Sequence, residues 1–169
     1  MAAPTIRPAT SDDLPAIRVL FNVLIPTTTV AFRDHLASED ELRDWFAAQT
    51  EHAHPVLVAD LDDEVVGYTT WASFRGGDRF PGYRHTAELT IHVRAEAHGR
   101  GVGRALLEAL VDEAARRDIH VLVAGIDADN DASIAFHAAL GFVEVARMPE
   151  VGRKFDRWLD LVLMQRIVT

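Results

Sequence analysis

The stretch His98-Gly99-Arg100-Gly101-Val102-Gly103-Arg104 carries the strongest local signal in the chain. It lies between a strand that we expect to end near Val93 and a helix that we expect to bury Leu106 and Leu107. Three glycines let successive backbone N–H groups turn toward one point, and the start of a helix adds partial positive charge there. The stretch therefore favours a site for a phosphate or pyrophosphate. The alternative is a turn that only reverses the chain.

Two common nucleotide-binding motifs do not match this stretch. A P-loop needs a Lys-Ser or Lys-Thr pair after its last glycine, and none follows here. The dinucleotide fingerprint needs a third glycine where Arg104 stands, and we expect no acidic residue to close the following strand as a ribose ligand. The anion site is therefore of another kind.

A second polar motif follows the next apolar strand, which we expect at residues 121–124. Asn130-Asp131-Ala132-Ser133 opens a short expected helix at residues 133–140. Asn130, Ser133 and His137 recur at i, i+3 and i+7, so they line one face of that helix and its entry. The spacing predicts that polar groups converge on one side.

The run Asp127-Ala128-Asp129-Asn130-Asp131 resembles a calcium loop only superficially. The glycine that such a loop requires would fall at Ala132, and its bidentate glutamate at Ala138. We therefore expect no bound metal.

Composition limits the class of protein. The 169 residues are 49% hydrophobic and 25% charged, which is typical of a globular domain. A formal net charge of −9 argues against a nucleic-acid partner, because phosphate backbones attract basic proteins. The absence of cysteine excludes thiolate nucleophiles, disulfides and Cys-ligated zinc, and agrees with a reducing cytosol. No secretion signal or long apolar run is present, so we expect a cytoplasmic protein with no membrane partner.

The order of elements predicts a single α/β domain over residues 1–169, with a mixed sheet. Apolar periodicity, N-caps and turn residues indicate two helices in the first part of the chain. The first starts at Ser11, has apolar positions as far as Leu24 and is stopped by Pro26. The second starts at Ser38. The remaining expected elements are antiparallel strands at 56–59, 65–71 and 88–94, a helix at 101–117, and later strands at 142–146 and 158–167.

Together, the glycine stretch and the Asn130 helix resemble the GNAT N-acetyltransferase superfamily, over nearly the whole chain. That superfamily holds the pyrophosphate of acetyl-CoA with an Arg/Gln-x-x-Gly-x-Gly/Ala loop, from which this chain departs at His98. The resemblance implies a mostly antiparallel central sheet flanked by about four helices. It also implies that acetyl-CoA, as co-substrate, contacts Arg100, Gly101, Val102, Gly103, Arg104, Asn130 and Ser133.

More narrowly, the chain is similar to the phosphinothricin and methionine sulfone or sulfoximine acetyltransferases. The similar blocks are Thr28-Thr29 followed by Phe32, Phe74-Arg75, Tyr83 to Glu88, Val123 to Asp127, and Val151 to Phe155. Departures are a longer loop between Arg75 and Tyr83, Asp156 in place of a glycine, and Leu89 and His92 in place of a His and a Tyr. This resemblance implies a small amino-acid-type acceptor bound by Thr28, Phe32, Arg75, Tyr83, Thr86 and Lys154. The resemblance and the apolar strand 159–164 also predict a homodimer.

Acetyl transfer from a thioester to an amine needs a base, a polarised carbonyl and a leaving thiolate. Glu88 matches the general base of the family, against the alternative of a solvated strand residue. His137 is expected beside the sulfur, where it donates to the thiolate or shares the role of base; the alternative is a structural histidine. Backbone N–H groups of the strand Ile91, His92 and Val93 are expected to polarise the carbonyl.

The leading hypothesis is direct acetyl transfer to the α-amine of a small acidic or sulfone-type amino acid, without an acetylated cysteine. Arg75 is the candidate for binding the acceptor's anion, because a guanidinium binds two oxygens in one plane. One alternative is the same chemistry on a peptide N-terminus or a polyamine. Another, from a different class, is a catalytically silent acyl-CoA-binding module. Composition does not separate these hypotheses.

Overall fold

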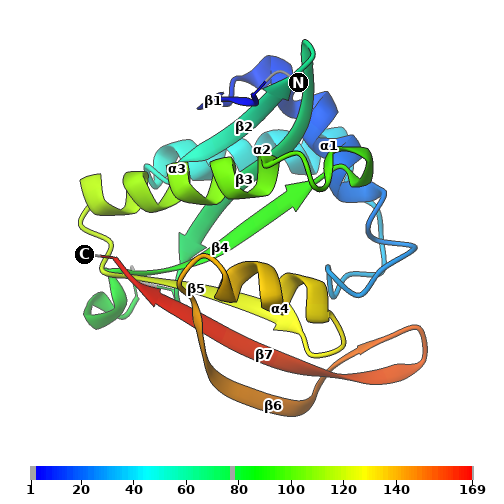
Figure 1. The fold of residues 1–169 in the computed structure, drawn as a ribbon, viewed down its shortest axis with the longest axis vertical. Helices are drawn as coiled ribbons and strands as arrows, with labels where there is room; N and C mark the ends of the chain where they lie inside the picture. The colour runs from blue at the N-terminus through cyan, green and yellow to red at the C-terminus, as the bar shows by residue number, and fades with distance from the viewer. Residues whose placement is uncertain (1–2, 77–78, 169) are drawn as a thin grey trace.

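The computed structural model describes residues 3–76 and 79–168, and a seven-stranded sheet crosses this part of the chain (Figure 1). The strand order is β1-β2-β3-β4-β5-β7-β6, and every neighbouring pair is antiparallel except β4 and β5. This confirms a mixed, mostly antiparallel sheet. The strands are β1 Thr5–Pro8, β2 Val56–Leu61, β3 Glu64–Ser73, β4 Thr86–Val93, β5 Val121–Asp127, β6 Val143–Lys154 and β7 Arg157–Ile167.

The described part of the chain has four α-helices, which cover both faces of the sheet (Figure 1). They are α1 Leu14–Asn22, α2 Glu39–Glu51, α3 Val102–Arg116 and α4 Asp131–Ala138. Alternate residues of β2 separate two cores: Val58 packs with α1 and α2, whereas Leu57 packs with α3. No helix in residues 3–76 and 79–168 is long and apolar enough to cross a membrane.

The first helix is shorter than its apolar pattern predicts. Residues Ser11–Asp13 form a 3₁₀ turn, and α1 ends at Asn22, four residues before Pro26. Asn22 binds Ala37 through both side-chain groups: Nδ2 donates to the Ala37 carbonyl at 3.0 Å, and Oδ1 accepts its N–H at 2.8 Å. This side chain joins the helix end to the segment before α2, so proline is not what stops the helix.

Strand β6 is much longer than the expected strand at residues 142–146. Two register shifts, between Glu144 and Ala146 and between Met148 and Gly152, let it follow β7 as far as Lys154. The turn that joins β6 to β7 is Phe155-Asp156, with φ of 51° and 58°. Asp156 therefore occupies a left-handed position, the backbone conformation that the expected glycine would adopt without strain.

The sheet opens between β4 and β5. These strands pair only from Thr86 opposite Val121 to Glu88 opposite Val123, although β4 continues to Val93 and β5 to Asp127. Beyond the paired residues the two strands diverge (Figure 1). The carboxylate of Glu88 thus stands at the branch point of a fork in the sheet. The expectation that no acidic residue closes β5 is wrong, because Asp127 is its last residue.

Candidate active site

Glu88 borders a cavity of about 380 Å³ on the face of the sheet beside the fork. Its Oε1 lies 3.2 Å from the point where a Cβ on Gly125 would stand, so the glycine leaves room for the carboxylate. The side chain stays open to solvent, yet burial of the carboxylate beside its neighbours raises its pKa. The cavity is lined by Val30, Phe32, Glu88, Gly125, Asp127, Met148, Val151 and Leu161.

The loop after α1 forms one wall of this cavity, and β6 holds that loop in place. The ring of Phe32 lies directly against Gly152, where no side chain intervenes. Lys154 is only 4% exposed, and its Nζ donates to the carbonyl of Ala31 at 2.6 Å. Of the expected acceptor residues, Phe32 therefore lines the cavity, whereas Lys154 ties the loop to the sheet.

The other expected acceptor residues do not line the cavity. Thr28 donates its hydroxyl to the carbonyl of Leu24 at 2.7 Å. Arg75 is exposed at the end of β3, with φ of 51° and its guanidinium 5.7 Å from the ring centre of Tyr83. Thr86 begins β4, two residues before Glu88 and on the same face. Residues 77 and 78 of the long loop between Arg75 and Tyr83 lie outside the described part of the chain.

The glycine stretch leads from β4 into the N-terminus of α3. Gly99 and Gly101 have φ of 73° and 81°, and no atom stands within 4 Å of the position where a Cβ on either would lie. Gly103 has a different role: a Cβ there would lie 3.2 Å from the ring of Phe136, so this glycine permits close packing of α3 on α4. His98 donates from Nε2 to the carbonyl of Val93 at 3.0 Å and so attaches the stretch to the end of β4.

Both arginines of the stretch bind carboxylates outside it. Arg100 donates to Asp62 at 2.9 Å, and Arg104 donates to Glu108 at 3.2 Å. The anion-binding capacity of the stretch therefore lies in its backbone N–H groups, since the first N–H groups of a helix have no partner within it.

Two backbone N–H groups of β4 point into the fork. Phe74 donates to the carbonyl of Thr86, and Arg94 to that of Val66, so the even-numbered residues of β4 exchange bonds with β3. The odd-numbered Ile91 and Val93 consequently direct their N–H groups to the other side.

We expected the backbone N–H groups of Ile91, His92 and Val93 to polarise the carbonyl. The backbone of His92 faces β3 instead. Its side chain packs against Tyr68 and Phe21, at ring-centre distances of 5.3 and 5.8 Å. Burial lowers the pKa of His92 to about 4, so the ring is neutral at pH 7.

The expected polar face of α4 is held together by local hydrogen bonds. Asn130 caps the helix, with its Oδ1 accepting from the N–H of Ser133 at 3.0 Å. His137 is 3% exposed and donates from Nδ1 to the carbonyl of Ser133 at 2.8 Å. Burial lowers the pKa of His137, and its Nε2 has no partner among the described residues. In this neutral form, with the proton on Nδ1, Nε2 is a hydrogen-bond acceptor and has no proton to donate.

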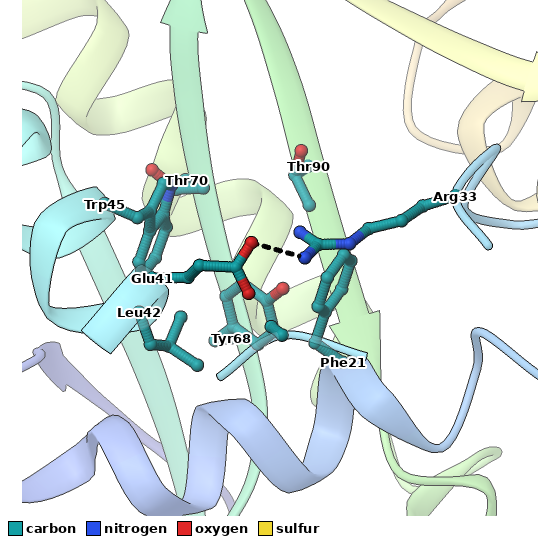
Figure 2. Close-up of a pocket in the computed structure, with 9 residues that line it drawn as sticks. Phe21, Arg33, Glu41, Leu42, Trp45, Tyr68, Thr70 and Thr90 are labelled. Carbon is teal, nitrogen blue, oxygen red and sulfur yellow. Dashed lines mark hydrogen bonds and ion pairs between the residues drawn. The ribbon is translucent and has the colours of Figure 1, made fainter. Parts of the chain in front are cut away.

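A second cavity, of about 240 Å³, lies between the helices α1 and α2 and the strands β3 and β4 (Figure 2). Arg33 extends past the ring of Phe21 and donates to Glu41 at 2.9 Å. Thr90 lines this cavity and shares its face of β4 with Glu88. The other lining residues are Phe21, Arg33, Ala37, Glu41, Leu42, Trp45, Tyr68 and Thr70.

Several residues that line these two cavities were not predicted from the sequence. The residues that line the second cavity occupy ordinary helix and strand positions, so no sequence motif predicts this cavity. Gly125, by contrast, interrupts an apolar strand, and a glycine there is a signal of close approach by another group. Within residues 3–76 and 79–168, no three His, Asp or Glu side chains gather in a way that could hold a metal.

Comparison with known proteins identifies relatives of this geometry. Residues 17–142 match the model of the acetyltransferase (GNAT) family. The chain is 42% identical to the L-amino acid N-acyltransferase MnaT of Escherichia coli, and 41% identical to an L-methionine sulfoximine/L-methionine sulfone acetyltransferase of Salmonella typhimurium; each match covers 95% of this chain and 92% of the relative. A crystal structure of a phosphinothricin acetyltransferase from Sinorhizobium meliloti in complex with acetyl-CoA has a TM-score of 0.92 at 32% identity, covering 99% of this chain and 89% of that one.

Proposed function

Because the chain belongs to the acetyltransferase (GNAT) family, we propose that it transfers acetyl from acetyl-CoA to the α-amine of a small amino-acid analogue, such as methionine sulfone, methionine sulfoximine or phosphinothricin. The observation that carries the proposal is the fork between β4 and β5. It places Glu88 beside a cavity and leaves backbone N–H groups free in the opening. The names of the relatives support the class of acceptor.

The residues of the glycine stretch fit the phosphate groups of acetyl-CoA. Gly99 and Gly101 are left-handed and have open space where a side chain would stand, so an anion has access to the backbone of residues 100–104. Ile91 and Val93 offer N–H groups to the arm of the cofactor, in the manner of an added strand. Asn130 and Ser133 extend the proposed contacts along the entry of α4.

Glu88 is the proposed general base. Acetyl-CoA supplies the acetyl group as a thioester when it is bound. Glu88 takes one proton from the acceptor's ammonium, which frees the nitrogen lone pair for attack on the carbonyl carbon. The N–C bond forms, the C–S bond breaks with its electron pair on sulfur, and the second proton of the nitrogen ends on the thiolate. With no cysteine in the chain, the transfer is direct.

The remaining site residues are proposed in supporting roles. His137 helps to place the leaving sulfur, and Arg75 binds the acceptor's anion. Phe32 contributes apolar surface, Tyr83 supports the guanidinium of Arg75, and Lys154 keeps Phe32 in place through Ala31. The catalytic unit is proposed to span residues 1–169.

An acceptor screen tests the proposed function. Thiol release from acetyl-CoA is measured with methionine sulfone, methionine sulfoximine, phosphinothricin, a peptide with a free N-terminus, and spermidine. We expect turnover with at least one of the three amino-acid analogues, at a rate well above the rate with the peptide or the polyamine. Preference for spermidine or the peptide would show that the acceptor belongs to a different class of amine. Binding of CoA without turnover of any amine would favour a silent acyl-CoA-binding module.

A further inference from the structure

The cavity beside Glu88 contains a second carboxylate, which the proposed mechanism does not use. Asp127 lines this cavity at the end of β5 and is 4% exposed. Its Oδ1 accepts the backbone N–H of Asp129 at 3.2 Å. Its Oδ2 is buried and accepts no hydrogen bond from any residue that the structure describes. A buried carboxylate oxygen that no protein group bonds favours a ligand that supplies a donor.

Asp127 and Glu88 lie on the same face of the sheet, on opposite sides of the space above Gly125. Gly125 and Asp127 are two residues apart on β5, which places their side-chain positions about 7 Å from each other on one face. The Oε1 atom of Glu88 lies 3.2 Å from the Cβ position of Gly125. The missing side chain at Gly125 therefore leaves the space between the two carboxylates open.

The cavity carries no positive charge of its own. Its eight lining residues include two acids and no Lys or Arg. Two cations of neighbouring segments donate to other groups: Arg157, whose charge also acts on Asp127, donates to Asp129 at 2.7 Å, and Lys154 donates to Ala31. Two carboxylates in a partly apolar cavity are balanced by a cationic ligand. A primary ammonium fits, because its three N–H donors can serve more than one carboxylate at once.

We propose that Asp127 binds the ammonium group of the acceptor and holds it beside Glu88, so that this cavity selects primary amines. The proposal rests on the proposed transfer of acetyl to an amine, and it adds the residue that positions that amine. Glu88 accepts the proton, while Asp127 keeps a hydrogen bond to a remaining N–H and orients the nitrogen. The apolar residues of the cavity, Phe32 and Leu161 among them, contact the rest of the acceptor.

The test is Asp127→Asn, which retains Oδ1 for the Asp129 N–H and removes the charge. Two ligands are compared: the best amine acceptor, and its analogue with hydrogen in place of the amino group, measured as a competitive inhibitor. We expect KM for the amine to rise 10- to 100-fold. The inhibition constant of the analogue and the Kd for acetyl-CoA are expected to change less than twofold.

Matched variants separate this role from a structural one. Asp131→Asn changes an exposed carboxylate four residues away and is expected to leave all three constants unchanged. Asp127→Ser, which also keeps an oxygen for the turn, is measured in parallel and is expected to behave like Asp127→Asn. Equal weakening of the amine and the analogue in either folded variant, or no weakening of the amine, overturns the proposal.

Failure of the proposed function gives a different result. In that case the wild-type protein acetylates no amine in the screen, and calorimetry of the amines against the protein with CoA replaces KM. An unchanged Kd for the amine in Asp127→Asn, or no binding of any amine to the wild type, then overturns the role of Asp127. A Kd raised at least tenfold supports it even without turnover.

Discussion

Burial raises the pKa of Glu88, so this carboxylate holds a proton at a higher pH than a fully solvated glutamate does. We expect Glu88→Gln to lower kcat/KM by about 10² to 10⁴ at pH 7, the usual range for loss of a general base, with little change in CoA affinity. The base acts only when it is deprotonated. Wild-type activity should therefore fall as the pH drops through this raised pKa, and the variant should lose that acidic limb.

The pH–rate profiles of both proteins check this expectation. Protein that binds CoA with an unchanged Kd provides the control for folding. Near wild-type turnover in Glu88→Gln would mean that another group, or water, serves as the base.

Arg75 is exposed and rests against Tyr83, so its effect on acceptor binding should be modest. We expect Arg75→Ala to raise KM for phosphinothricin or methionine sulfone about tenfold, or ~1.4 kcal/mol, and to spare the Kd for acetyl-CoA. Arg79→Ala provides the matched control, because Arg79 is an exposed arginine of the same loop. A similar rise in KM in both variants would assign the effect to general surface charge.

At the scale of elements, the β6–β7 turn contains a conformation that its sequence tolerates poorly. Asp156 has φ of 58°, a left-handed position that favours glycine, and its side chain is fully exposed. The ion pair with Arg153, at 3.4 Å, adds little at this exposure. We expect Asp156→Gly to raise the free energy of unfolding by about 0.5–1 kcal/mol, measured by urea denaturation.

The matched control for this turn is Asp44→Gly, an exposed position within α2. Glycine in a helix interior loses backbone entropy without relieving strain, so no gain is expected there. Equal changes in the two variants would show that the left-handed backbone of Asp156 is not the cause.

At the scale of the whole molecule, buried neutral histidines link stability to pH. Folding lowers the pKa of His92 from 6.5 to about 4. The unfolded chain therefore takes up the proton first, so stability is retained above pH 6.5 and is lost as the pH falls toward 4. The full loss from His92 is about 3 kcal/mol. His137, whose pKa is also lowered by burial, acts in the same direction.

The variant His92→Phe removes this titration and keeps an aromatic ring against Tyr68 and Phe21. We expect its free energy of unfolding to vary less between pH 7 and pH 4 than that of the wild type. Urea denaturation at several pH values measures the difference. Parallel curves for the two proteins would show that His92 is not responsible.

Assembly is the second property of the whole molecule, and the homodimer stays a prediction. The apolar strand at residues 159–164, on which we based it, lies in β7 and pairs with β5 and β6 on its two sides. The edge strands of the sheet are β1 and β6, and on β6 Val143, Val145 and Val151 are exposed. We expect light scattering to give twice the chain mass, and Val145→Lys to reduce it toward one chain. A monomeric wild type would contradict the prediction.

The sequence by itself determined the family, the mixed sheet and the glycine stretch at the start of α3. These features are local: periodicity, caps and glycines act within a few residues, and each block of the family resemblance is contiguous. Glu88 was also predicted as a site residue from a contiguous block of the family resemblance. The ends of α1 and β6 were not, because a side-chain bond from Asn22 to Ala37 and two register shifts along β7 set them.

Only the tertiary structure decided which side chains share the cavity. Phe32, Glu88 and Asp127 meet there because β4 and β5 stop pairing at Glu88, and because Lys154 of β6 binds Ala31, 123 residues earlier. Contacts of such separation leave no periodic trace in the chain. The same holds for the neutral state of His92 and for the Oδ2 of Asp127, which no group in residues 3–76 or 79–168 bonds, since the protonation and hydrogen bonding of a side chain follow from what surrounds it after folding.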